Sequence, residues 1–256
     1  MKPRVAIISL TCDEGCEFAI LDLGAKFLEL AKHLEVKNFR LIEEEKHAKD
    51  ERYDIAFLEG SVITKENLAK LKFVRERSKV LITLGNCADM GGIHQIKNWG
   101  DKNKIAKCVY KHPKSIDNPE IKRIDEIVKV DFAIPGCPIN ANDFVRVVNN
   151  LLAGKMLRHP ERPVCFECQT RGYECLLQKG EVCFGPITSG GCEAVCLKSK
   201  QACWGCRGLL NQTEGQKESV KNFMTFLNKN YKKIEIEHPV EFFGIKKEIK
   251  KVYEKN

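Results

Sequence analysis

The feature that most constrains this chain is a dense group of cysteines in its second half. Eight of the thirteen cysteines lie within residues 165–206, spaced Cys-x2-Cys-x6-Cys-x7-Cys-x8-Cys-x3-Cys-x6-Cys-x2-Cys. Eight thiolates are the ligand number of two four-cysteine metal centres, and a Cys-x2-Cys pair lets one turn direct two sulfurs to one metal or cluster. So short and loop-rich a segment cannot bury enough apolar area unaided, and we therefore expect its fold to depend on metal.

Three interpretations of this segment are open. Disulfides require an oxidising compartment, but the N-terminal MKPRVAIISLTC has no apolar leader with a small-residue cleavage site and no twin arginine, which predicts a cytoplasmic protein. Structural zinc would use the same number of thiolates. Two four-cysteine zinc sites usually form separate knuckles of two Cys-x2-Cys pairs, however, and the inner cysteines here are spread more widely. The spacing therefore favours iron–sulfur clusters.

Charge and hydropathy bear on the partners of the chain. The formal net charge of +8 would by itself suggest nucleic acid. An oxidised 4Fe-4S cluster with four thiolate ligands carries a net charge of about −2. Three such clusters would reduce the net charge of the chain to about +2. Aromatic residues are not interleaved with basic ones in a stacking pattern, so we expect no nucleic acid partner. The chain has no run of about eighteen apolar residues, so we expect no membrane span.

Five apolar runs of strand length precede the cysteine-rich segment. They cover residues 4–10, 38–43, 53–60, 79–85 and 130–137. Continuous apolar runs are typical of parallel strands that are buried on both faces. Helical patterns lie between most of them, and this alternation predicts an α/β fold with a doubly wound parallel sheet over residues 1 to about 155.

Several helices are predicted with their ends or faces. Thr64 is expected to cap one helix, and Asn142 to cap another that ends at Gly154. Residues 17–34 carry two apolar stripes, which predicts a helix buried on two sides, the second covered either by this chain or by a partner subunit. Residues 214–230 form a further helix, whose expected buried side is Val220, Phe223, Phe226 and Leu227. The lysine-rich helix at the end of the tail is expected to be solvated.

Four more cysteines follow predicted strands: Cys12, Cys16, Cys87 and Cys137. In open parallel sheets, sites form beyond the carboxyl ends of the strands, so these thiols are expected to meet at one rim. Glycines beside them allow close backbone approach, which favours a third cluster there. Cys108 fits no such pattern, and we interpret it as structural.

The motifs LTCDEGCE, FLEGSV, TLGNCADMGG and GCPIN, with CFECQTRG, CFGPITSGGC and CWGCRG, resemble the small subunits of cytosolic nickel–iron hydrogenases. The resemblance covers about residues 4–210 and is greatest to small subunits with three 4Fe-4S clusters, as in sulfhydrogenases and the hydrogenases serving deazaflavin or heterodisulfide reduction. It implies a flavodoxin-like domain with a proximal cluster, a loop-rich region with medial and distal clusters, and a C-terminal helical tail. The boundaries are then 1–157, 158–213 and 214–256.

The resemblance also implies the ligands of three 4Fe-4S clusters. The distal set is Cys165, Cys168, Cys175 and Cys183, and the medial set is Cys192, Cys196, Cys203 and Cys206. The proximal set is Cys12, Cys16, Cys87 and Cys137. Asp13 occupies the usual first ligand position of the family, so either Cys12 reaches in from one residue earlier, which we favour because thiolate is the standard ligand, or Asp13 binds through its carboxylate.

Glu17 and Glu59 match acidic positions that lie close to the proximal cluster in the family. There they would tune its potential or carry protons. Two structural alternatives are that Glu17 sits in a first helical turn, where its charge suits the helix dipole, and that Glu59 is a buried hydrogen-bond acceptor.

The function implied is electron transfer within an oxidoreductase complex. The chain has no pair of Cys-x2-Cys motifs placed at opposite ends of a long helical subunit, as a nickel–iron site requires. Hydrogen chemistry would therefore belong to a large subunit docked at the proximal rim. Electrons would pass on to an acceptor subunit with flavin or further iron–sulfur clusters. In the alternative, the large subunit of a related oxidoreductase lacks the nickel–iron site.

Overall fold

Five parallel strands form one sheet in the order β2-β1-β3-β4-β5, which is the flavodoxin-like order. They are β1 (Arg4–Ser9), β2 (Glu35–Phe39), β3 (Tyr53–Glu59), β4 (Ser78–Leu84) and β5 (Phe132–Ile134). The computed structural model describes residues 2–42, 51–116 and 119–254. The predicted α/β class and parallel sheet are confirmed, although β2 begins earlier in the chain than expected.

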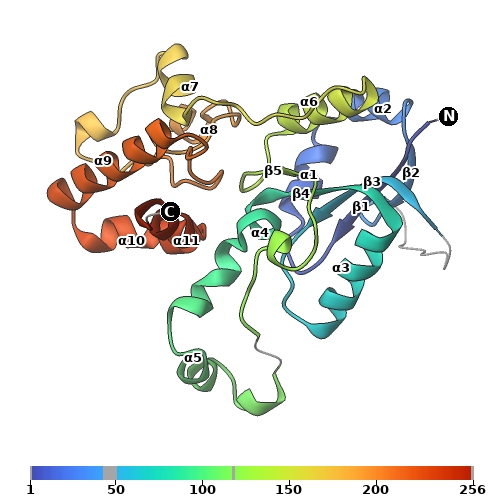
Figure 1. The fold of residues 1–256 in the computed structure, drawn as a ribbon, viewed down its shortest axis with the longest axis horizontal. Helices are drawn as coiled ribbons and strands as arrows, with labels where there is room; N and C mark the ends of the chain where they lie inside the picture. The colour runs from blue at the N-terminus through green and yellow to red at the C-terminus, as the bar shows by residue number, and fades with distance from the viewer. Residues whose placement is uncertain (1, 43–50, 117–118, 255–256) are drawn as a thin grey trace.

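Helices cover both faces of this sheet (Figure 1). Along β1, Val5 and Ile7 face one core while Ala6 and Ile8 face the other, which explains why the strand is apolar throughout. The first core is closed by α1 (Gly15–Leu21), α2 (Ala25–Ala31) and α6 (Ala141–Leu152). The second is closed by α3 (Lys65–Arg77) and α4 (Gly85–Met90).

The single helix predicted over residues 17–34 is wrong. The chain forms α1 and α2 there, separated at Gly24, whose φ of 54° is left-handed. One apolar stripe, which includes Ile20 and Leu30, packs on the sheet. On the other, Phe18 and Leu28 keep 53% and 65% of their surface exposed, so the described chain does not cover it.

The two predicted helix caps had different outcomes. Thr64 caps α3, because its hydroxyl accepts the Asn67 N–H at 3.1 Å. The cap of α6 is Asn140 and not Asn142: the Asn140 side chain accepts the N–H groups of Asn142 and Asp143 at 2.8 and 3.2 Å. Asn142 already lies within the first turn, where its own N–H needs that acceptor.

The connection from β4 to β5 is long and passes beneath the sheet in Figure 1. It contains η1 (Gly92–Trp99), α5 (Lys102–Val109), η2 (Pro113–Ser115) and η3 (Ile124–Glu126), three of them 3₁₀-helical. Cys108, the cysteine interpreted as structural, is exposed on α5.

The cysteine-rich segment and the C-terminal helices build a second lobe beside the sheet (Figure 1). Its helices are α7 (Val164–Thr170), η4 (Leu177–Lys179), α8 (Val195–Lys198), α9 (Glu214–Asn230), α10 (Lys233–Phe242) and α11 (Lys246–Tyr253). Helix α9 has the predicted bounds, but Met224 is buried where Phe226 was expected, and Phe226 is 44% exposed. None of the helices in the described part of the chain combines the length and apolar character needed to cross a membrane.

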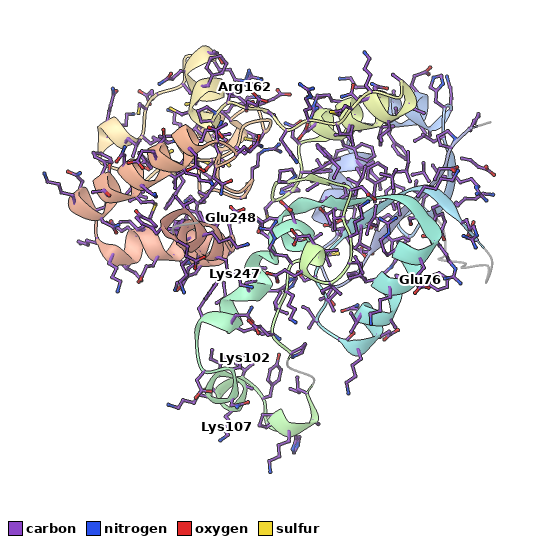
Figure 2. All side chains as sticks on the ribbon, in the orientation of Figure 1. Glu76, Lys102, Lys107, Arg162, Lys247 and Glu248 are labelled. Carbon is purple, nitrogen blue, oxygen red and sulfur yellow. The ribbon has the colours of Figure 1, made fainter. Side chains whose placement is uncertain are left out.

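The last helix is not the solvated tail that its composition predicts. Val252 of α11 is buried in one core with residues of the cysteine-rich segment, including Phe184 and Ile187. Glu248 points from α11 toward α4 (Figure 2), and its carboxylate accepts the Leu209 N–H at 2.9 Å. The C-terminal helices therefore support the cysteine-rich segment directly.

Candidate metal centres

The strand register brings the first cysteine group together. Ser9, Glu59, Leu84 and Ile134 are aligned across four strands, so the loops that follow begin at the same rim. Cys16 lies in the first turn of α1, Cys87 lies in α4, and Cys137 follows β5. Burial and then the Cys137 thiol raise the pKa of Cys87 to about 12, and Cys137 is also among the groups that raise the pKa of Cys16. Cys16, Cys87 and Cys137, three of the four thiols predicted to meet at this rim, are therefore close neighbours.

Glycines leave the space that these sulfurs occupy. A Cβ atom on Gly85 would overlap the Cys16 sulfur, and one on Gly92 would lie 2.9 Å from the Cys87 sulfur. Both glycines have positive φ values, of 77° and 51°. The backbone can approach the thiols here only because neither position carries a side chain.

Glu59 organises the backbone beside Cys16. Its two carboxylate oxygens accept the N–H groups of Cys16 and Glu17, each at 3.0 Å, and so cap α1 from a neighbouring strand. The structure therefore shows Glu59 as a buried hydrogen-bond acceptor, which was the structural alternative for this residue. Burial raises the pKa of Glu59 despite these bonds.

Glu17 is fully buried, and neither carboxylate oxygen has a hydrogen-bond partner among the described residues. Burial, followed by repulsion from Glu59, raises its pKa to about 8. Glu17 is thus mainly protonated at neutral pH and does not act as a helix-dipole charge in the first turn of α1. A neutral buried acid beside Cys16 is a group that can hold a proton at the rim.

Cys12 and Asp13 take different positions at this rim. The Cys12 sulfur lies 3.9 Å from the Leu10 carbonyl oxygen, and burial followed by Glu59 raises the pKa of the thiol to about 12. Asp13 is exposed, and its carboxylate acts electrostatically on Cys87 and Cys137.

A second group of cysteines lines an apolar pocket in the second lobe. The four cysteines of this pocket are Cys165, Cys168, Cys175 and Cys183. Tyr173, Leu176 and Leu197 are among the side chains that complete its wall. The sulfur of Cys183 accepts the Cys203 N–H at 3.4 Å, which joins this pocket to the third group.

The third group contains Cys192, Cys196, Cys203 and Cys206. Burial raises the pKa of Cys206 to about 12, and Cys192, Cys196 and Cys137 add to the effect. The Cys206 sulfur also accepts the backbone N–H of Cys137. Because Cys206 adjoins Cys137 and Cys203 adjoins Cys183, the third group lies between the other two.

The donor set fits iron–sulfur clusters. Soft thiolates select such clusters, and backbone N–H groups directed at the sulfurs stabilise their negative charge. Such donors come from Ile139 to Cys16, Ile93 to Cys87, Gly185 to Cys183, Ala194 to Cys192 and Gly205 to Cys203. All thirteen cysteines are free thiols, so the disulfide interpretation is wrong for this structure. In the described ranges, no three His, Cys, Asp or Glu side chains are close enough to hold a single metal ion.

Sequence reasoning missed two residues that position these groups. Arg207 is 3% exposed and donates to the carbonyls of Gly190 and Pro135 at 2.8 and 2.6 Å and to the Asp143 carboxylate at 3.0 Å, which ties the second lobe to the sheet. Glu167 accepts the N–H of Gly191 at 2.7 Å and orders the approach to the third group. The available signal was position: each is a charged residue next to cysteines that were expected to be ligands.

Comparisons with known proteins agree with this architecture. The family model described as NADH ubiquinone oxidoreductase, 20 Kd subunit, matches residues 12–151. Sulfhydrogenase 2 subunit delta of Pyrococcus furiosus is 34% identical over 227 residues, covering 86% of this chain and 93% of that protein. A subunit of the F420-non-reducing hydrogenase of Methanothermobacter thermautotrophicus is 27% identical over 250 residues, covering 84% and 81%. A chain of the NAD+-reducing NiFe hydrogenase in its H2-reduced state aligns with a TM-score of 0.55 and 27% identity, covering 62% of this chain and 96% of that one.

Proposed function

Because the chain belongs to the family of the NADH ubiquinone oxidoreductase 20 Kd subunit, and within it to the small subunits of nickel–iron hydrogenases, we propose that it conducts electrons through three 4Fe-4S clusters in a cytoplasmic hydrogenase complex. The proximal cluster is assigned to Cys16, Cys87 and Cys137 with Cys12 or Asp13. The distal cluster is assigned to Cys165, Cys168, Cys175 and Cys183, and the medial one to Cys192, Cys196, Cys203 and Cys206.

The observation that carries this proposal is the linear order of the three cysteine groups. The middle group contacts one neighbour through the Cys137 N–H and the Cys206 sulfur, and the other through the Cys203 N–H and the Cys183 sulfur. When bound, the clusters would pass single electrons between a catalytic large subunit and an acceptor subunit. The chain's own residues hold the sulfurs, direct N–H groups toward them and limit water around them.

The two ends of this row suit two different partners. The large subunit is assigned to the rim at Cys16, where Phe18 of α1 is 53% exposed on the side that the described chain leaves uncovered. A flavin- or iron–sulfur-containing acceptor subunit is assigned to the pocket of Cys165, where Cys175 is exposed. Glu17 and Glu59 remain assigned to the proximal cluster, as groups that tune its potential or hold a proton.

Anaerobic purification of the chain with its partner subunits tests the proposal. We expect a brown complex with about twelve irons and as many labile sulfides per chain, and nickel in the large subunit. Electron paramagnetic resonance during a redox titration should resolve three clusters. A folded chain without iron and sulfide would contradict the proposal.

A second candidate is an electron-transfer subunit whose large partner has no nickel–iron site. It is supported by the altered LTCDEGC motif, in which Asp13 stands at the usual position of a cysteine ligand. The same preparation separates the two candidates. A large subunit that lacks nickel and its four nickel-binding cysteines would favour the second one.

A further inference from the structure

We infer that Asn86 is a positioning residue for electron transfer: it fixes the proximal cysteine group against the medial one and thereby sets the rate at which an electron passes between their clusters. The inference rests on the proposed function, because it concerns one step between two of the proposed clusters. Asn86 directly precedes Cys87 in α4, the helix on the side of the sheet nearest the second lobe (Figure 1). It is buried, with 2% of its surface exposed.

The side-chain amide of Asn86 joins three separate parts of the chain. Its nitrogen donates one hydrogen to the Cys206 carbonyl oxygen at 2.9 Å and the other to the Phe243 carbonyl oxygen at 3.1 Å. Because both acceptors are carbonyl oxygens, only the NH2 end of the amide can face them, and both of its hydrogens are used. Cys206 belongs to the medial group, and Phe243 directly follows α10. The amide therefore ties the helix of Cys87 to a medial ligand and to the C-terminal helices.

The backbone of Asn86 completes this junction through a second proximal ligand. Its N–H donates to the Gly136 carbonyl oxygen at 2.7 Å. The N–H of the same peptide unit, which belongs to Cys137, donates to the Cys206 sulfur. The hydrogen bonds thus form a closed ring through Asn86, the Gly136–Cys137 peptide and Cys206. This ring fixes the positions of two proximal ligands, Cys87 and Cys137, relative to a medial one.

The separation of two redox centres decides how fast an electron passes between them, because tunnelling falls off exponentially with distance. In this step one electron leaves the proximal cluster, which is oxidised, and enters the medial cluster, which is reduced, and no bond forms or breaks. Hydrogen bonds between the ligands also couple the two centres better than a van der Waals gap does. Removing the Asn86 amide would leave two carbonyl oxygens without this donor and let Cys206 move relative to Cys87.

Other contacts keep the two lobes joined when this amide is removed. Arg207 binds the Asp143 carboxylate at 3.0 Å, and the Asn140 side chain donates to the Cys192 carbonyl oxygen at 3.2 Å. Both contacts run between the sheet and the second lobe, and neither involves Asn86. A variant at position 86 should therefore assemble and bind its clusters, while the spacing of the proximal and medial groups becomes looser.

Asn86→Leu in the intact complex, purified anaerobically, tests the inference, because leucine has the branched shape of asparagine but no donor. We expect about twelve irons per chain and a weaker magnetic coupling between the reduced proximal and medial clusters in electron paramagnetic resonance. After rapid mixing with hydrogen and freezing, reduction of the medial and distal clusters should be several-fold slower than in the wild type. Hydrogen isotope exchange at the nickel–iron site needs no transfer along the clusters and should keep the wild-type rate.

Asn98→Leu is the matched control. The Asn98 amide also bonds backbone groups, donating to the Ile121 carbonyl oxygen at 2.8 Å and accepting the Ile121 N–H at 3.1 Å, but these partners lie in the connection from β4 to β5 and not in a cysteine group. This variant should keep the wild-type coupling and transfer rate. Wild-type coupling and rates in Asn86→Leu, or an equal loss in Asn98→Leu, would overturn the inference.

If Asn86→Leu does not assemble, Asn86→Asp decides, because aspartate keeps the shape of asparagine and replaces the donor nitrogen by an oxygen. A weaker coupling is again expected, and an unchanged coupling would contradict the inference. A wild-type complex without iron would instead contradict the proposed function, so the two failures are distinguishable.

Discussion

Replacing Asp143 by alanine should destabilise the junction between the sheet and the second lobe. The Arg207 side chain is 1% exposed, the Asp143 side chain is 4% exposed, and the two are 3.0 Å apart. Without the carboxylate, the Arg207 charge stays buried against two carbonyl oxygens only. Breaking a buried pair by removing one partner costs about 3–5 kcal/mol, so we expect a loss of that size in the free energy of unfolding. This is at least about a hundredfold in the unfolding equilibrium.

Arg146→Ala is the matched control for this prediction. Arg146 bonds the same Asp143 carboxylate at 2.5 Å, but its side chain is 40% exposed. Its removal should cost less than about 1 kcal/mol, because water replaces most of what is lost. Urea unfolding of the iron-loaded protein under anaerobic conditions, followed by circular dichroism, measures both variants. Equal losses in the two variants would refute the argument that burial of Arg207 sets the cost.

Two other predictions concern a cysteine group and a helix cap. Gly85→Ala should lower the iron content, because the added Cβ would overlap the Cys16 sulfur. Gly154→Ala should keep the iron content, because Gly154 also has a positive φ but no atom lies within 4 Å of the Cβ position. Equal iron contents in the two variants would contradict the steric argument. Thr213→Ala should cost about 1 kcal/mol of thermal stability by removing the cap of α9, and Ser219→Ala within the same helix should cost less than about 0.5 kcal/mol. Two indistinguishable melting curves would count against the cap.

The parallel sheet could be predicted because its information is local. A strand buried on both faces is apolar at every position, and β1 shows this with Val5 and Ile7 on one side and Ala6 and Ile8 on the other. The carboxyl ends of parallel strands then share one rim whatever the loops do, so the meeting of Cys16, Cys87 and Cys137 follows from the order of motifs along the chain.

The predictions that were wrong concern features that depend on contacts with residues distant in sequence. Helix α9 has the predicted bounds, since a cap and a periodic pattern are local, but which face is buried depends on what packs against it, and Met224 replaced Phe226. The lysine-rich α11 looks solvated by composition. Burial of Val252 and the bond from the Leu209 N–H to Glu248 depend on a segment far away in the chain.

The sequence by itself determined the class of fold, the number of cysteines available for clusters and the rim at which Cys16, Cys87 and Cys137 gather. Only the tertiary structure decided that the three groups form one row and that Arg207 is buried against Asp143. The physical reason is that spacing along a chain limits which side chains can meet. The direction in which each one points is set by backbone contacts, such as those at Gly60, from strands far away in sequence.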